Sequence, residues 1–282
     1  MNGRGVYTWE DGERYEGGWL NDRRNGHGEM RYRSGNVYTG DWVDGARTGH
    51  GVYVETNGTR YEGAFANNSK HGRGVLKSAE GWTYEGDFAD GIFCGQGIYT
   101  FKSGDRYEGS FANGGFNGRG KYIWFSGRRY EGDFVDGKPN GRGTFFEMNG
   151  DRYSGDVVDG KIHGKCSFTA ALGDTYEGEY RNDMKNGRGI YTWANGDCYE
   201  GTFRDDLPHG KGVMIWRDGS RYEGDYLNGK RTGRGILRYS DGFRYEGDIV
   251  DGQPHGRGTA TYSNGSRKSG RWVNGKFSGF LF

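Results

Sequence analysis

The chain repeats one pattern of apolar and polar positions at a spacing of 23 residues. A tyrosine opens each repeat, glycine and an aromatic or β-branched residue follow two and four positions later, and acidic residues commonly stand between them. This alternation is typical of a half-buried β-strand. The column consists of Tyr15, Tyr38, Tyr61, Tyr84, Tyr107, Tyr130, Tyr153, Tyr176, Tyr199, Tyr222 and Tyr245, and Lys268 holds the next place.

Each alternating segment ends at a turn signal. With the tyrosine as repeat position 1, position 7 is Asn or Asp in every repeat, usually followed by glycine, as in Asp44-Gly45. Such pairs supply the positive φ angles of a two-residue hairpin turn. A second alternating segment covers positions 12 to 18, and one repeat is therefore predicted to be a β-hairpin. Prolines predict a loop at position 10, where Pro139, Pro208 and Pro254 stand.

An isolated hairpin is marginally stable, so successive hairpins are expected to pair edge to edge. The predicted fold is all-β: an elongated, single-layer, twisted antiparallel sheet of tandem hairpins, a solenoid-like rod whose repeats contact only their neighbours. We expect one continuous array over residues 1–282, with a partial repeat at 1–14, full repeats beginning at each tyrosine and a partial repeat at 268–282.

The composition sharpens this picture. A chain with 58 glycines and few aliphatic residues resembles a disordered one, but 21 Tyr, 16 Phe and 8 Trp and a net charge of +1 oppose that interpretation. Nearly all the glycines fall in five repeat columns, at positions 3, 8, 12, 14 and 21. We therefore predict a core of aromatic rings, from positions 1 and 5, packed over glycine backbone.

Charge and cysteine content exclude several classes. Balanced charge provides no basic field for nucleic acid, no apolar run approaches the length of a membrane span, and residues 1–9 lack the apolar run of a secretory signal. Cys94, Cys166 and Cys198 are predicted to lie too far apart to form disulfides. Reduced thiols indicate a cytoplasmic location.

Charged columns occupy the face opposite the rings. Glu recurs at position 2, Arg at position 23 and a basic residue at position 13. Two interpretations stay open: the columns form cross-strand ion pairs that set the register, or the basic column meets anionic lipid headgroups. The candidate headgroup residues are Arg73, Arg119, Arg142, Lys165, Arg188, Lys211, Arg234 and Arg257.

The unit Y-E-G-D-F-x-D-G-x-x-x-G-R-G-x-Y-x-x-x-x-G-x-R resembles the MORN repeat (membrane occupation and recognition nexus) over essentially the whole chain. The resemblance implies twisted sheets with a groove. It also implies scaffolds that link membranes to cytoskeleton in ciliary, flagellar or basal-complex structures, hold partner helices, often dimerise and in some cases bind phospholipid. Lys268 in place of Tyr, Cys166 in place of Gly and Leu281 in place of Gly depart from the pattern.

Two further sets of residues are candidates for binding. Tryptophans at position 18 are either core or the lining of an exposed partner-binding groove, because a single layer leaves them uncovered; these are Trp9, Trp124, Trp193 and Trp216. The open C-terminal edge needs capping or pairing, and it carries an apolar cluster that predicts a homodimer through this end: Phe277, Phe280, Leu281 and Phe282.

No catalytic set emerges, and no cofactor is expected. The G-R-G triplets arise from the repeat and not from a phosphate loop, and the six histidines show no zinc-ligand spacing, although a metal site shared across a dimer stays open. Carbohydrate or choline binding lacks the adjacent aromatics and the secretion signal that usually accompany it. We predict a non-enzymatic scaffold, cytoplasmic and associated with cytoskeleton or membrane, that presents an aromatic groove to a protein partner. The alternative is peripheral binding to anionic phospholipids.

Overall fold

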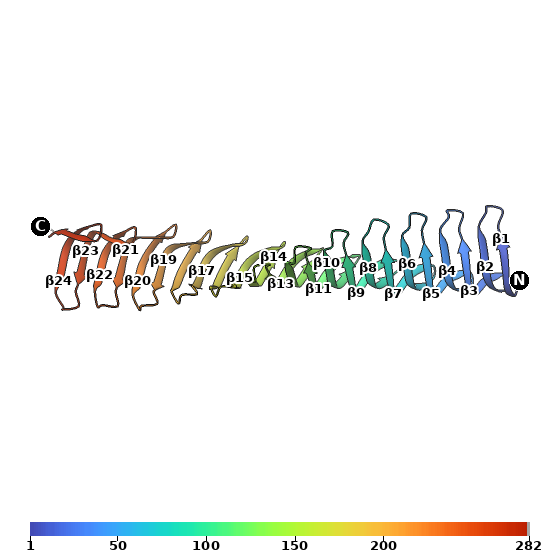
Figure 1. The fold of residues 1–282 in the computed structure, drawn as a ribbon, viewed down its shortest axis with the longest axis horizontal. Helices are drawn as coiled ribbons and strands as arrows, with labels where there is room; N and C mark the ends of the chain where they lie inside the picture. Colours follow the sequence, from blue (N-terminus) through green and yellow to red (C-terminus); the bar gives the residue numbers. More distant parts are fainter. Residues whose placement is uncertain (281–282) are drawn as a thin grey trace. The chain divides into compact units, whose positions relative to one another are not determined.

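The computed structural model describes residues 1–280, and they are all-β (Figure 1). Its 25 strands are antiparallel and belong to one sheet, which confirms the predicted fold class. The chain divides into two compact units, Met1–Pro139 and Asn140–Phe282. In each unit, strands adjacent in the chain are adjacent in the sheet.

The first unit is a meander of alternating short and long strands. They are β1 (Gly3–Thr8), β2 (Arg14–Leu20), β3 (Arg23–Arg31), β4 (Val37–Val43), β5 (Ala46–Val54), β6 (Arg60–Ala66), β7 (Ser69–Lys77), β8 (Thr83–Ala89), β9 (Ile92–Thr100), β10 (Arg106–Ala112), β11 (Gly115–Ile123) and β12 (Arg129–Val135).

The second unit has the same alternation, and all but the first two residues of its first strand lie within it. Its strands are β13 (Lys138–Phe146), β14 (Arg152–Val158), β15 (Lys161–Thr169), β16 (Thr175–Arg181), β17 (Met184–Thr192), β18 (Cys198–Arg204), β19 (Leu207–Ile215), β20 (Arg221–Leu227), β21 (Lys230–Arg238), β22 (Arg244–Val250), β23 (Gln253–Thr261), β24 (Arg267–Val273) and β25 (Lys276–Gly279).

The predicted hairpin turn at positions 7 and 8 is confirmed. Asp44 and Gly45 have φ angles of 48° and 83°, both in the left-handed region, as a type I′ turn requires. Where position 8 is not glycine it is Asn or Asp, the residues that best tolerate this conformation, and Asn68 has a φ of 71°. A second turn, at positions 18 to 22, links each hairpin to the next.

The predicted loop at position 10 is wrong, because the second strand of each hairpin begins at position 9. Pro208 lies inside β19 opposite Phe203, next to the turn-closing pair of Arg204 and Leu207. In an antiparallel ladder alternate pairs exchange no hydrogen bond, so a proline placed next to such a closing pair costs no ladder bond. Its carbonyl still accepts a hydrogen bond, from the Gly229 N–H at 2.8 Å.

The predicted core of rings over glycine is confirmed. Tyr84 is completely buried; a Cβ added to Gly86 would overlap its hydroxyl, and one added to Gly97 would overlap its ring. Phe88 and Phe111 each approach that ring edge-on, with centroids 5.0 Å away, and the hydroxyl donates to the Asp87 carbonyl at 2.8 Å. Glycine therefore makes room for one flat tyrosine per hairpin, and rings of two hairpins enclose it.

The repeat that carries Cys166 shows what happens when a glycine is missing. The Cys166 side chain is buried, and its thiol donates to the Asp156 carbonyl at 3.4 Å, the acceptor position that tyrosine hydroxyls use in other repeats. Tyr153, the tyrosine of this repeat, is only half-buried and packs against Phe168 at 4.7 Å. The thiol thus takes the place of the ring.

Candidate functional site

The face opposite the rings carries a ladder of ion pairs. Along the short strands, Arg at position 23 pairs with Glu at position 2, two residues later, and the Arg60–Glu62 separation is 2.7 Å. This pairing holds the pKa of the Glu62 carboxyl below its ordinary value. Equivalent pairs are Arg14–Glu16, Arg106–Glu108, Arg129–Glu131, Arg221–Glu223 and Arg244–Glu246.

A second set of pairs crosses between strands, as one of the two sequence interpretations expects. The basic residue at position 13 lies opposite position 4 of the next repeat, and Lys211 Nζ stands 2.6 Å from Asp225 Oδ1. Hydrogen bonding to Lys211 lowers the pKa of the Asp225 carboxyl. The same arrangement pairs four more of the predicted headgroup residues: Arg73–Asp87, Arg119–Asp133, Arg142–Asp156 and Arg234–Asp248.

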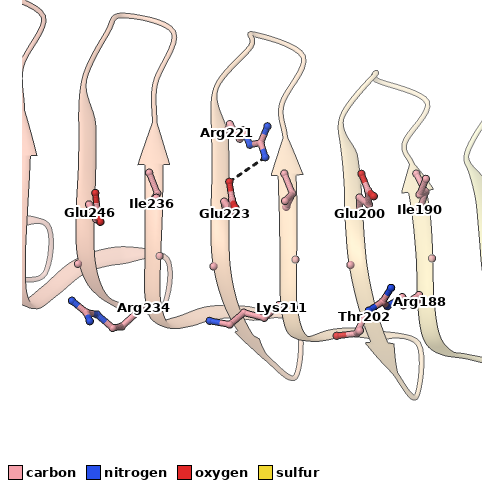
Figure 2. Close-up of a pocket in the computed structure, with 17 residues that line it drawn as sticks. Arg188, Ile190, Glu200, Thr202, Lys211, Arg221, Glu223, Arg234, Ile236 and Glu246 are labelled. Carbon is pink, nitrogen blue, oxygen red and sulfur yellow. Dashed lines mark hydrogen bonds and ion pairs between the residues drawn. The ribbon is translucent and has the colours of Figure 1, made fainter.

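This charged face is hollowed into a groove of about 1090 Å³ in the second unit (Figure 2). Its floor is glycine backbone from six strands, β17 to β22. Figure 2 shows two rows of side chains separated by the glycines. One row alternates aliphatic and acidic residues: Ile190, Glu200, Glu223, Ile236 and Glu246, with Val213 placed in it by its pairing with Glu223. The other contains Arg188, Thr202, Lys211 and Arg234.

The ion-pair ladder is interrupted at one end of this groove. Thr202 stands opposite Arg188, where an acidic residue would be expected, and Cys198 stands two residues before Glu200, where other repeats have Arg. Within residues 1–280, neither Arg188 nor Glu200 has an ion-pair partner, and both side chains are exposed. The groove therefore offers one free cation and one free carboxylate on adjacent strands.

The remaining predicted headgroup residues lie in different surroundings. Lys165 faces Glu179 across β15 and β16. Arg257 faces Arg271 across β23 and β24, and Ser269 replaces the usual Glu at position 2. Like charges directly opposite each other are destabilising in a sheet, so this pair is a local concentration of positive charge.

The four candidate tryptophans do not line this groove. Each lies half-buried at the turn between hairpins, in a position that continues the ring side of its strand. The Trp124 ring packs at 4.7 Å from Tyr122 and lies under the Arg128 guanidinium; Trp193 packs on Tyr191 in the same way. Their role in partner binding stays a prediction.

At the C-terminal end, Phe277 takes the place that Lys268 leaves vacant in the ring column. A Cβ added to Gly270 would lie 3.0 Å from the Phe277 ring, and Trp272 packs on that ring at 5.4 Å. Phe280 is 68% exposed. Leu281 and Phe282 lie outside the described residues.

The described residues also bear on metal binding and on the crossing of a membrane. No group of His, Cys, Asp and Glu among residues 1–280 is arranged to hold a metal ion. No helix in that part of the chain is long and apolar enough to cross a bilayer.

Solved structures resemble the chain weakly. The TCP domain of SAS-4 from Drosophila melanogaster, in complex with a proline-rich motif of Ana2, is 11% identical with a TM-score of 0.32, covering 62% of this chain and 83% of that one. The TCP10 domain of Danio rerio CPAP, with a STIL peptide, is 10% identical with a TM-score of 0.25 and 96% coverage of both chains. At such scores these likenesses carry no argument. No curated protein matches the chain.

The MORN repeat family model matches almost the entire sequence. The matched segments are residues 1–14, 15–37, 38–60, 61–83, 84–106, 107–127, 130–152, 153–175, 176–198, 199–221, 222–244, 245–267 and 269–280. The chain therefore belongs to the MORN repeat family, whose typically non-catalytic arrays generally act as protein-binding or membrane-associated scaffolds.

Proposed function

We propose that this chain is a non-enzymatic scaffold that binds a protein partner in the groove of β17 to β22. The observation that carries the proposal is the interruption of the ion-pair ladder at Arg188 and Glu200. The groove's other lining charges, such as Lys211 and Glu223, already have partners in the chain. A ligand gains the most binding free energy from charges that have no partner in the chain. Here these charges, Arg188 and Glu200, have opposite signs.

Apolar surface beside these charges supports a protein ligand over a uniformly anionic one. Ile190 is 43% exposed on β17, opposite Glu200, and Val213 and Ile236 repeat its position along the groove. The glycine floor lets a partner's backbone approach closely. A protein segment with both charge signs around an apolar contact fits this surface, because binding regions combine apolar anchors with complementary charges.

Single charge reversals test the proposal. In the native cell, proximity labelling with the full chain should recover a set of neighbours that Glu200→Arg or Arg188→Glu loses. Glu85→Arg is the matched control, because Glu85 occupies the same repeat position in the first unit, is exposed and also lacks a preceding Arg. If both reversals retain every neighbour that the control retains, the groove is not the binding site.

The tryptophan hypothesis is tested in the same experiment. Trp124→Ala combined with Trp193→Ala removes two candidate anchors of the ring face and leaves the lining of the groove unchanged. Loss of neighbours from this variant, with the charge reversals unaffected, would assign partner binding to the ring face. The neighbours themselves would show whether the scaffold works at a membrane–cytoskeleton junction in the cytoplasm, as family membership suggests.

Peripheral binding to anionic phospholipid is the second candidate, and the Arg257–Arg271 pair favours it. These two arginines are paired across neighbouring strands, whereas Lys211 and Arg234 pair with carboxylates. Flotation with phosphoinositide liposomes at physiological salt should then depend on Arg257→Ala with Arg271→Ala and not on Arg234→Ala. Absence of flotation by the wild-type chain would eliminate this candidate.

A further inference from the structure

The ring face repeatedly holds a cation of its own chain. In five repeats the residue at position 10 is Arg or Lys, and its charged group lies over aromatic rings of the same unit, which is a cation–π arrangement. The shortest of these distances is 4.3 Å, from the Arg24 guanidinium to the Trp42 ring. The others include Arg47 over Tyr53 at 5.1 Å, Lys70 over Tyr61 at 5.4 Å, Lys185 over Tyr191 at 5.2 Å and Arg231 over Trp216 at 5.0 Å.

Two adjacent repeats of the first unit lack this cation. Position 10 is Phe93 in β9 and Phe116 in β11. Each ring stacks on the buried tyrosine of its own hairpin, with centroids 3.9 Å apart for Phe93 and Tyr84 and for Phe116 and Tyr107. Within residues 1–280, the ring of Tyr99, farther along β9, is therefore left without the charged group that covers Tyr53 and Tyr191 in other repeats.

An open pocket of about 520 Å³ lies beside these rings. Trp82 and Tyr99 stack in it with centroids 5.4 Å apart and an interplanar angle of 19°, and Phe101 packs at 4.7 Å from Tyr99. All three rings are half-buried. The remaining lining residues are Glu80, Lys102 and Ser103.

Trp82 creates this pocket at a position that is polar in several other repeats. Asp174 occupies it in the second unit, where it accepts a hydrogen bond from the Tyr191 hydroxyl at 2.6 Å. Replacement of a small acceptor by an indole adds a second aromatic surface beside Tyr99.

Glu80 provides the carboxylate in the pocket. Burial, and to a smaller extent the negative charge of Glu80, raises the pKa of the Tyr99 hydroxyl. Lys102 lies at the pocket as an exposed side chain, and its ammonium group covers no ring in the described part of the chain. The pocket thus combines aromatic faces with a carboxylate, and the described residues place no cation over those faces.

We propose that the Trp82–Tyr99 pocket binds an arginine side chain of a partner polypeptide. The planar guanidinium stacks on aromatic faces and pairs with carboxylate, which an ammonium ion does less well. The partner's arginine would cover Trp82 and Tyr99 as Arg47 covers Tyr53 and Arg231 covers Trp216, although position 10 of this repeat is itself filled by Phe93. This site lies in the first unit and does not depend on the groove of β17 to β22.

An NMR titration of the full chain with ¹⁵N-labelled tryptophan tests the proposal. The probe is N-acetyl-Gly-Arg-Gly amide, and its uncharged analogue has citrulline in place of arginine. The indole resonance of Trp82, identified from Trp82→Phe, should shift saturably in the millimolar range with the arginine probe and at least about fivefold more weakly with citrulline. The other seven tryptophans serve as internal controls.

Two variants with little effect on folding complete the test. Glu80→Gln keeps the shape of an exposed side chain and should weaken the arginine probe severalfold, while Glu85→Gln, on the opposite face of β8, should leave it unchanged. Equal affinity for arginine and citrulline, an unaltered affinity in Glu80→Gln, or no saturable shift of Trp82 would each overturn the proposal.

Discussion

Substitution of Gly120 by alanine should disrupt one repeat of the core far more than its size suggests. Gly120 lies in β11 under the ring of Tyr107, and an added Cβ would stand 2.5 Å from both the ring and the hydroxyl of that tyrosine. Real carbon atoms do not approach so closely, so Tyr107 must move. Tyr107 is completely buried, and its hydroxyl donates to the Ser110 carbonyl at 2.8 Å.

The contacts of Tyr107 set the magnitude. Loss of its burial costs about 2 kcal/mol, its hydrogen bond about 1 kcal/mol, and the stacking on Phe116 and edge contacts with Phe111 and Phe134 about 1 kcal/mol more. Partial repacking of the displaced ring returns some of this energy. We therefore expect a loss of about 3 kcal/mol in the local free energy of opening.

The control is Gly115→Ala in the same strand. An added Cβ there meets no atom closer than 3.7 Å, so the change should be within about 0.5 kcal/mol of neutral. Because repeats open locally rather than all together, hydrogen exchange by mass spectrometry over β10 and β11 is the appropriate assay. Gly120→Ala should accelerate exchange there roughly a hundredfold, and Gly115→Ala should not.

Equal effects of the two variants would refute the reasoning, since both remove one glycine from one strand. The mechanism has a second check. In a Tyr107→Ala background the ring is absent, and Gly120→Ala should then cost much less than it does in the wild-type chain. An undiminished cost would show that backbone conformation, and not the ring, requires glycine.

Further predictions concern pH, thiol reactivity, surface charge and assembly. Burial raises the pKa of Tyr61 to about 12, so the folded state favours the neutral phenol. Its stabilising contribution is complete below pH 10 and is lost between about pH 10 and pH 12, by at most about 1.4 kcal/mol per pH unit for each such tyrosine. Alkaline unfolding monitored by circular dichroism should fall in this range, and stability rising with pH there would be contrary to it. Burial likewise raises the pKa of the Cys166 thiol to about 11, so iodoacetamide at pH 8 should label Cys166 last among the three cysteines; labelling of Cys166 first would contradict its buried position. Asp225→Asn should cost no more than about 1 kcal/mol in urea denaturation, because Asp225 is partly exposed and its partner Lys211 is exposed; a larger loss would mean that the ladder is essential to folding. Deletion of residues 277–282 should convert a homodimer to a monomer in analytical ultracentrifugation, and an unchanged mass would remove the dimer hypothesis.

The periodic features of the fold could be predicted from the sequence because each has a local cause. A type I′ turn needs positive φ at Asp44 and Gly45 wherever the chain folds, and a tyrosine that lies flat needs bare backbone beneath it. The start of the second strand could not be predicted in this way. Pro208 is typical of a loop on its own, and it is tolerated because Phe203 faces it in a pair that does not require its missing N–H.

The candidate sites depend on register, which explains why they could be predicted only in part from the sequence. The columns at positions 13 and 4 lie 14 residues apart in the chain, and strand pairing places Arg188 opposite Thr202 but Lys211 opposite Asp225. The sequence shows Thr202 at position 4, where several other repeats have Asp. It does not show that Arg188 is thereby left opposite an uncharged residue.

The sequence by itself determined the repeat, its turns, the ring core and the family, because these follow from side-chain period and backbone conformation within 23 residues. The tertiary structure decided which charges neutralise each other, where the charged face is hollowed, and which rings lack a covering cation. Those properties depend on contacts between neighbouring strands, where one substituted residue, such as Trp82 or Thr202, changes the surroundings of a residue in the adjacent strand.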